Sequence, residues 1–451
     1  MSLPTAFCAR MRALLGDEQA PVFLESFWAP RAHGLRVNPR YPAGKDHPAH
    51  RYFTLTPVPW CAEGFYYPAD ERPGKHPLYE AGAYYIQEPS AMAVGALAAP
   101  GPDEWVLDLC AAPGGKTTHL APHAGFVLAN EIHPARAKTL AQSVERMGLT
   151  NTVVTNETPA RLAARFPEAF DCVVVDAPCS GEGMFRKDED AASEWNEDSP
   201  ALCAARQDEI LDEAVRMLRP GGRLIYSTCT FAPEENEGTL TRLLARHPDF
   251  TVQAVEGYPW FAPGEPAWYP GADERVRHAF RLWPHKLRGE GHCCAVLTRA
   301  GDAPRRMPPA VQPLTRLPDE LTAFWRDTMA LPLDGLRFTQ AGDRLWLSAQ
   351  PLPDTAGLKT LRTGVEVGTL KKGRLEPAHA LAHAYAPEEF VRRLELAADS
   401  PEAERYLKGE TLPCSTENGW TAVCVDGCVL GWGKTVGGVL KNHYPKGLRW
   451  K

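Results

Sequence analysis

Two apolar runs of this sequence end in residues that a buried strand does not need. The run DCVVVDAPC ends in Asp176, Pro178 and Cys179, with glycines following at once, and the run RLIYSTC ends in Cys229. Parallel strands of a doubly wound sheet place functional side chains at their carboxyl ends, where ligands bind. We therefore expect the two thiols to face one crevice. A single cysteine there is most simply a small buried hydrophobic side chain, but that explanation fits a pair poorly.

A thiolate in that crevice has a definite use beside a methyl donor. C5 of a pyrimidine is a poor nucleophile, and addition of a thiolate at C6 makes C5 reactive enough to accept a methyl group. The C5 proton must then leave and the thiol must be expelled. Asp176 can hold N3 and the exocyclic amine of a cytosine, and Pro178 fixes the backbone beside it. These residues alone do not decide which of the two thiols attacks.

A second motif, VLDLCAAPGGKTTHLA, joins a predicted strand to a helix that begins at about Lys116. Asp108 ends the strand, and the Ala-Pro-Gly-Gly turn lets the backbone approach a ligand closely. Glu131 ends the next predicted strand, where an acidic residue can bind both hydroxyls of a ribose. The glycine spacing matches neither the dinucleotide motif nor the P-loop, so it favours a nucleoside without a phosphate chain. We expect S-adenosylmethionine.

The elements that position these residues alternate between strands and helices. The predicted strands are WVLDLC, FVLANE, NTVVTN, DCVVVDAP and RLIYSTC, and a long helix is predicted before the last of them. Ser199 can cap that helix, Leu211, Val215 and Leu218 share one face, and Pro220-Gly221-Gly222 ends it. The pattern predicts a doubly wound α/β domain, in which the fourth and fifth strands flank the first.

Length and composition limit the remaining possibilities. The 451 residues suggest about three structural units, and 44% hydrophobic with 23% charged residues is ordinary for a globular protein. Neither a secretory signal nor a long apolar segment is evident, so we expect a cytoplasmic protein whose twelve cysteines are reduced. No Cys-x-x-Cys pair occurs, and no metal site is expected. The net charge is −7, but residues 430–451 carry five basic side chains and no carboxylate, which suits a polyanionic partner.

Three further segments have open interpretations. Arg186 and Lys187 either contact RNA phosphate or pair with Asp188 and Glu189. The PEENEG run from Pro233 is expected to be a solvated acidic start of a helix. Three side chains of a preceding segment lie over the cofactor or simply pack in the core: Tyr84, Tyr85 and Gln87.

With these residues in place, the chain resembles the bacterial 16S rRNA cytosine-5 methyltransferases of the NOL/NOP/Sun family, in particular their RsmF (YebU) subgroup, over nearly its whole length. GLRVNPRY is similar to the N-terminal motif, CAAPGGKTT to the cofactor loop, DAPCSGEGMFRKD to the base-binding loop and YSTCTFAPEENEG to the nucleophile loop. The tail, with RTGVEVGTLKKGRLEPAHAL and GWGKTVGGVLKNHYPKGLR, is similar to the subgroup's extension, which ends in a PUA-like RNA-binding module.

The resemblance implies roles for individual residues. Cys229 would be the nucleophile, although in DNA cytosine-5 methyltransferases the Pro-Cys thiol attacks instead. Cys179 would assist proton removal and product release, Asp176 would bind the base, and Lys116 would act in catalysis. The cofactor would be held by Cys110, Ala111, Ala112, Pro113, Gly114, Gly115, Lys116, Glu131, Arg136 and Asp176.

The resemblance also implies the domains and partners. A Rossmann-like methyltransferase domain would span 78–300, after a small N-terminal α+β RNA-binding accessory domain over 1–77. A linking α+β domain over 301–380 and a PUA-like RNA-binding domain over 381–451 would follow. The product would be 5-methylcytidine in 16S rRNA, with the 30S subunit as the partner, and the enzyme would be a monomer without membrane association.

Two alternative functions remain open, and the sequence differs from the family pattern at one position. The chain could instead be a non-catalytic RNA-binding ribosome assembly factor, or a 5-methylcytosine methyltransferase acting on tRNA. An exocyclic-amine methyltransferase is disfavoured, because Cys179 stands where such an enzyme needs an aromatic residue. Where relatives carry an Asp that meets the adenine, this sequence has VVTNETPAR, so Asn156, Glu157 or Thr158 would serve.

Overall fold

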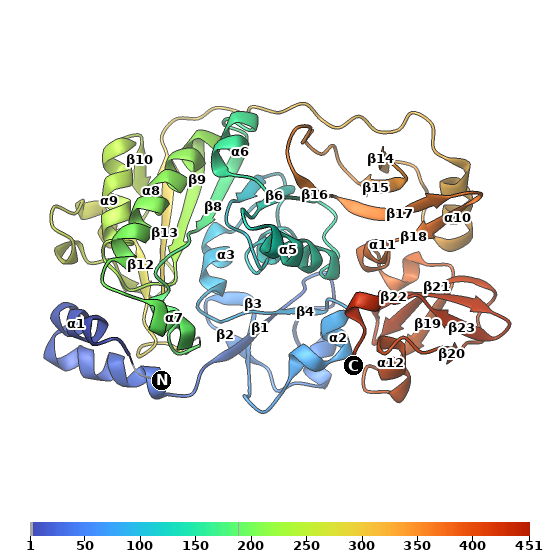
Figure 1. The fold of residues 1–451 in the computed structure, drawn as a ribbon, viewed down its shortest axis with the longest axis horizontal. Helices are drawn as coiled ribbons and strands as arrows, with labels where there is room; N and C mark the ends of the chain where they lie inside the picture. The colour runs from blue at the N-terminus through green and yellow to red at the C-terminus, as the bar shows by residue number, and fades with distance from the viewer. Residues whose placement is uncertain (1–2, 188) are drawn as a thin grey trace.

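The computed structural model describes residues 3–187 and 189–451. Its strands form four sheets, and the largest of them lies in the middle of the chain (Figure 1). The other three belong to the N-terminal and C-terminal regions, which lie below and to the right of the central sheet in this view. The functional residues predicted from the sequence lie on the central sheet and the loops that follow its strands.

The central sheet confirms the predicted fold class. Its strand order is β11-β12-β13-β9-β8-β5-β6-β7-β16, with β10 paired to β13. β5 to β9 run parallel to one another, whereas β13 and β16 pair antiparallel with β9 and β7. β9 pairs with β8 and not with β5, so the fifth strand does not flank the first as expected. The parallel strands are β5 (Trp105–Asp108), β6 (Phe126–Asn130), β7 (Thr152–Thr155), β8 (Phe170–Asp176) and β9 (Leu218–Thr228); the others are β10 (Phe250–Val252), β11 (Ala262–Pro263), β12 (Phe280–Leu282), β13 (His292–Arg299) and β16 (Thr360–Thr363).

Helices cover both faces of this sheet, which explains why its central strands are apolar runs without alternation. One core contains Leu162, Leu211 and Leu240, and the other contains Met92 and Leu140. None of the described helices is both long enough and apolar enough to cross a bilayer. The helices are α3 (Met92–Ala98), α4 (Thr117–Leu120), α5 (Pro134–Arg146), α6 (Pro159–Arg165), α7 (Glu189–Glu194), α8 (Ser199–Met217) and α9 (Glu237–Arg246).

Helix α8 has the predicted start and an earlier end. Its N-cap is Asp198, without a side-chain cap, and Ser199 is the first helical residue rather than the cap. The helix ends at Met217, and Leu218 already begins β9, so Pro220-Gly221-Gly222 lies inside the strand segment and does not end the helix. Strand pairing of Leu218 with Phe170 competes successfully with the helical pattern there.

The N-terminal region consists of a helix and a small sheet. Helix α1 (Thr5–Glu25) lies apart from the sheet, beside α7 in Figure 1, and its Phe7 and Phe23 rings pack against Phe185 and Phe231. The sheet has the order β2-β3-β1-β4 and is followed by the central domain. Its elements are β1 (His33–Val37), β2 (Thr56–Val58), β3 (Cys61–Tyr67), β4 (Tyr84–Ile86) and the short helix α2 (Pro77–Glu80).

Two sheets follow the central domain, after the extended segment that crosses the top of Figure 1. A hairpin turn at Asp426-Gly427 joins β21 and β22. The first sheet contains β14 (Arg337–Ala341), β15 (Arg344–Ser348), β17 (Val365–Lys371) and β18 (Arg374–Pro377); the second contains β19 (Arg393–Leu396), β20 (Leu412–Pro413), β21 (Gly419–Val425), β22 (Cys428–Val436) and β23 (Val439–Asn442). The helices of this region are α10 (Asp319–Thr328), α11 (His379–Ala384) and α12 (Pro401–Leu407).

Candidate functional site

The two predicted thiols meet beyond the carboxyl ends of β8 and β9. The sulfur atoms of Cys179 and Cys229 are 3.3 Å apart, and the backbone N–H of Cys229 donates to the Cys179 sulfur at 3.4 Å. The strands bring them together because Asp176 is in register with Ser227, so the two chains leave the sheet at the same level. The expectation that both thiols converge is confirmed.

An ion pair lies beside the thiols. Lys116, which caps α4, binds the Asp176 carboxylate, and the Ser227 hydroxyl donates to the same carboxylate at 2.6 Å. Burial alone would raise the pKa of Asp176, but the Lys116 ammonium outweighs it and holds that pKa below its usual range. Burial would likewise lower the pKa of Lys116, and Asp176 reverses that shift. Both groups are therefore charged at neutral pH. We call Lys116, Asp176, Cys179 and Cys229 the strand-end site.

The electrostatics distinguish one of the thiols. The pKa of Cys179 is raised well above its ordinary value, first by its contact with the Cys229 sulfur and second by burial. The Cys179 thiol consequently keeps its proton at neutral pH and can donate it in a hydrogen bond to the Cys229 sulfur. Lys116 in turn acts electrostatically on Cys229. The Cys229 sulfur therefore has an S–H donor beside it and lies close enough to the Lys116 ammonium for the two to interact.

The acidic PEENEG run is buried, so the expectation of a solvated helix start is wrong. Glu235 accepts hydrogen bonds from the Ser180 backbone and hydroxyl and from Gln207 at 2.9 Å, and Ser180 contacts Thr230 at 2.8 Å. Burial raises the pKa of Glu235 to about 7. Because Ser180 follows Cys179 and Thr230 follows Cys229, this network fixes the two thiol loops to each other.

A second acidic residue of that run is also paired. Glu237 forms an ion pair with Arg281, which donates from Nε at 2.8 Å, and both side chains are almost fully buried. The partners come from a helix and a strand 44 residues apart in sequence, so local charge patterning could not indicate the contact.

Arg186 has a partner that neither interpretation of the sequence named. Its guanidinium pairs with Glu290 at 2.8 Å and donates to the carbonyls of Ser26 and Gly289, and both ionic side chains are buried. These contacts hold the loop before β13. Asp188 and the side chain of Glu189, the two suggested partners, lie outside the described residues, and a contact with RNA phosphate stays a prediction.

The expected cofactor residues surround the turn after β5. Asp108 is buried, its Oδ2 accepts from Thr117 at 2.6 Å, and its Oδ1 has no hydrogen-bond partner among the described residues. Burial raises the pKa of Asp108 to about 7. Gly114 has a φ of 113°, and a Cβ there would lie 2.9 Å from Ser143 Cβ, so only glycine fits this part of the Cys110 to Lys116 turn.

The ends of β6 and β7 complete this region. Glu131 lies 3.5 Å from Arg136, whose guanidinium also donates to the Ala112 carbonyl at 2.8 Å. Asn156 donates to the carbonyls of Glu131 and Ile132, whereas Glu157 accepts from the Lys359 backbone and Thr158 caps α6. Of the three residues left open for the adenine, Asn156 thus contacts the segment of Glu131 directly.

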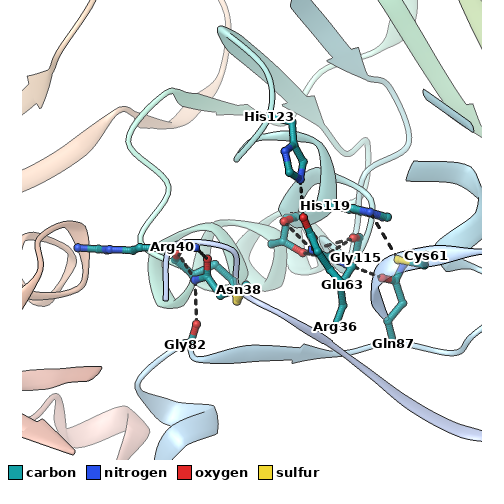
Figure 2. A network of polar contacts seen from close by, with 12 residues as sticks. Arg36, Asn38, Arg40, Cys61, Glu63, Gly82, Gln87, Gly115, His119 and His123 are labelled. Carbon is teal, nitrogen blue, oxygen red and sulfur yellow. Dashed lines mark hydrogen bonds and ion pairs between the residues drawn. The ribbon is translucent and has the colours of Figure 1, made fainter. Parts of the chain in front are cut away.

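A buried arginine ties the N-terminal sheet to the cofactor turn (Figure 2). Arg36 of β1 donates to Gln87, to the carbonyls of Gly115 and Thr118, and to the Thr118 hydroxyl, at 2.8–3.1 Å, and it pairs with Glu63 at 3.5 Å. Sequence reasoning placed Gln87 near the cofactor or in the core but assigned no role to Arg36. A charged residue within the largely apolar strand HGLRV is the sequence feature that could have indicated a buried polar contact.

Models of known families match most of the chain. The model described as 16S rRNA methyltransferase RsmB/F matches residues 95–298, and the N-terminal domain of 16S rRNA methyltransferase RsmF matches 3–89. The RsmF rRNA methyltransferase first C-terminal domain matches 323–385, and the methyltransferase RsmF PUA domain matches 393–450.

Individual proteins are similar over the whole length or over the central part. Ribosomal RNA small subunit methyltransferase F of Klebsiella pneumoniae is 35% identical, with 99% of this chain and 96% of the relative covered, and its Escherichia coli counterpart is 33% identical over the same shares. Among solved structures, a methyltransferase homolog protein from Pyrococcus horikoshii is 25% identical, covers 66% of this chain and 100% of its own, and superposes with a TM-score of 0.56. NSun6 from Pyrococcus horikoshii, at 19% identity, a TM-score of 0.57 and coverage of 66% and 99%, shares the fold.

Proposed function

Since the chain belongs to the RsmF family of 16S rRNA methyltransferases, we propose that it transfers a methyl group from S-adenosylmethionine to C5 of a cytosine in 16S rRNA. The observation that carries this proposal is the pair of thiols 3.3 Å apart beside the partly buried carboxylate of Asp176. An enzyme that methylated an exocyclic amine would have no use for either thiol, whereas methylation at C5 uses a nucleophile and a second proton-bearing group.

The residues around the turn after β5 fit a nucleoside cofactor. The unpartnered Asp108 oxygen and the Glu131 carboxylate are acceptors of the kind that ribose hydroxyls need, and the glycines of the turn leave room for a ligand near the backbone. S-adenosylmethionine, when bound, supplies an electrophilic methyl group. We propose that it is held by residues 110–116, Glu131 and Arg136, with Asn156 next to the adenine.

The nucleophile is proposed to be Cys229. Attack of its sulfur on C6 forms the C6–S bond and places electron density on C5, which then bonds to the methyl carbon. Asp176 accepts hydrogen bonds from the cytosine edge, and the Lys116 ammonium stabilises negative charge on the ring and on the sulfur. Loss of the C5 proton to water reforms the C5–C6 double bond and expels the sulfur. The protonated Cys179 assists this release by donating its S–H to the departing sulfur.

We propose that the flanking regions bind the RNA. The predicted division at residues 77, 300 and 380 stays a prediction. The basic segment 430–451 lies on β22, β23 and the chain end, which the PUA model covers, and it suits a phosphate backbone. We propose 16S rRNA in the 30S subunit as the substrate and a monomeric enzyme.

The test compares substrates and cysteine variants. Wild type, Cys229→Ala, Cys179→Ala and the control Cys203→Ala are incubated with labelled S-adenosylmethionine and with 30S subunits, naked 16S rRNA or tRNA, and products are mapped by mass spectrometry. We expect 5-methylcytidine in 16S rRNA from wild type and Cys203→Ala, none from Cys229→Ala, and a covalent RNA adduct with Cys179→Ala. Full activity of Cys229→Ala would refute the nucleophile assignment. Binding without methylation of any substrate would instead support a non-catalytic assembly factor.

A further inference from the structure

His292 stands at the start of β13, next to the strand that carries the nucleophile. β13 pairs antiparallel with β9, with Cys293 opposite Thr228 and Cys294 opposite Ser227. One further step in this register brings His292 to the level of Cys229. Residues opposite each other in an antiparallel pair share a face of the sheet, so His292 and Cys294 are on the face of Ser227, whose hydroxyl binds Asp176.

A hydrogen-bonded chain fixes the imidazole and its tautomer. The Ser90 hydroxyl donates to the Glu88 carboxylate and lies 2.8 Å from Nδ1 of His292. Because the hydroxyl proton is used on Glu88, the serine oxygen accepts from Nδ1–H, and the neutral ring then carries its lone pair on Nε2. Nε2 has no hydrogen-bond partner in the described part of the chain.

Charged groups of the strand-end site act on this ring. Burial lowers the pKa of His292 below its ordinary value, and the charges acting on it are those of Glu88, Lys116, Asp176 and Lys187. The imidazole is consequently neutral at pH 7, and its free nitrogen is an acceptor. Asp176, held as a carboxylate by Lys116, supplies a second acceptor nearby.

Two acceptors in the same part of the site match one feature of the proposed substrate. The exocyclic amine of cytosine carries two N–H groups, whereas uracil has a carbonyl oxygen at that position, which would face both lone pairs. We propose that His292 is a base-specificity residue whose Nε2 accepts a hydrogen bond from the amine of the target cytosine, beside Asp176. This inference rests on the proposed function and adds a residue that the cysteine chemistry does not require.

An anchoring role alone would leave this arrangement unexplained. The loop before β13 is already held by the buried pair of Arg186 and Glu290 and by the Glu290 backbone, which donates to Glu88 at 2.8 Å. His292 adds one hydrogen bond to that anchor, through Nδ1. With an anchoring role alone, Nε2 would keep no hydrogen-bond partner among the described residues, whereas the amine of a bound cytosine could donate to it.

The test separates recognition of the base from later steps. In 16S rRNA transcribed with 5-fluorocytidine, the fluorine cannot leave as a proton does, so the covalent adduct accumulates once Cys229 has attacked and the methyl group has been transferred. We expect His292→Phe, which keeps a ring of similar shape, to form this adduct about tenfold more slowly than wild type, because one hydrogen bond to the base is lost. His285→Phe, a buried histidine beside Phe23 and Trp283, is the control and should match wild type.

Three outcomes bear on whether His292 recognises the target cytosine. Adduct formation by His292→Phe at the wild-type rate would overturn the proposal, even if release of methylated RNA were slow. Absence of adduct with wild type would overturn the proposed function itself, and the proposal with it. If His292→Phe does not fold, Ser90→Ala replaces it: the ring stays but its tautomer is no longer fixed, and adduct formation should slow by about threefold, with unchanged binding of S-adenosylmethionine.

Discussion

The strand-end site and the network around Arg36 both hold charged groups away from water, but they differ in what is left unpaired. The guanidinium of Arg36 has five N–H groups, and its five hydrogen bonds to Gln87, Glu63, Gly115 and Thr118 use them all. In the strand-end site, the hydrogen bonds that the two thiols form with described residues are to each other and to the Cys229 backbone, and a nearby carboxylate oxygen on Asp108 has no partner among those residues.

The difference separates a structural role from a chemical one. Full pairing makes the Arg36 network rigid, so that it can hold the cofactor turn in one position (Figure 2). Incomplete pairing in the strand-end site leaves donors, acceptors and a nucleophile free for a ligand. Substitutions in the Arg36 network should therefore change stability and cofactor affinity, and substitutions in the strand-end site should change the rate of methyl transfer.

The largest expected effect is on the rate, from Lys116→Met. Removal of the ammonium should lower single-turnover methyl transfer about a thousandfold, because both the ring charge and the thiolate lose their cation. The pKa of Asp176 should rise when burial is no longer opposed, so the acid side of the rate profile should move to higher pH. Lys138→Met, an exposed lysine of α5, is the control. A rate within threefold of wild type would contradict the assignment.

Arg36→Lys should show the opposite pattern. A lysine ammonium has three donors and cannot replace five, so we expect a loss of about 3 kcal/mol in stability and a cofactor Kd raised about tenfold. The rate at saturating cofactor should change little. Thermal unfolding and calorimetric titration measure both, with the exposed Arg31→Lys as the control. A lower rate of methyl transfer at saturating cofactor, with unchanged cofactor affinity, would contradict the structural role of the Arg36 network.

Glu235 belongs to the network that joins the two thiol loops, and its effect on stability depends on pH. Burial raises its pKa to about 7 from the ordinary 4.5, so its contribution to stability is complete below pH 4.5 and is lost as pH rises through 7. Glu235→Gln stays neutral, and its stability relative to wild type should therefore increase by about 2 kcal/mol between pH 5.5 and 8. Melting curves across this range, with exposed Glu209→Gln as the control, provide the measurement. A difference independent of pH would show that Glu235 does not titrate there.

The smallest effect is expected at the edge of the Arg36 network. The hydrogen bond that His123 donates to the Glu63 carboxylate raises the pKa of His123 above 6.5, so this pair stabilises the fold at low pH and loses its effect as pH rises through the raised value. His123 is 44% exposed, so His123→Gln should cost less than about 1 kcal/mol at pH 6 and nothing at pH 8.5. Thermal unfolding of His123→Gln at pH 6 and pH 8.5, with the exposed His133→Gln as the control, measures this loss of stability. An equal loss at the two pH values would exclude the ion pair with Glu63 as the cause.

Much of the fold could be predicted because its signals are local. The apolar run of β8 and the periodicity of α8 each lie within one element, and the rule for parallel strands then places Cys179 and Cys229 together. The end of α8 was misjudged because strand pairing of Leu218 outweighed the helical pattern. The PEENEG run was misjudged because nothing near it in sequence indicates the partners Ser180 and Arg281.

The sequence by itself determined the parallel strands, the turn that suits a nucleoside, and the meeting of two thiols with Asp176, because each follows from short-range patterns and from the rule that parallel strands end at one edge of the sheet. Only the tertiary structure decided which charges are buried and paired. Arg36 reaches Thr118 across 82 residues, and Ser90 reaches His292 across 202. Burial of a charged group depends on partners brought close by packing of separate elements, and no pattern within one segment records where those partners are.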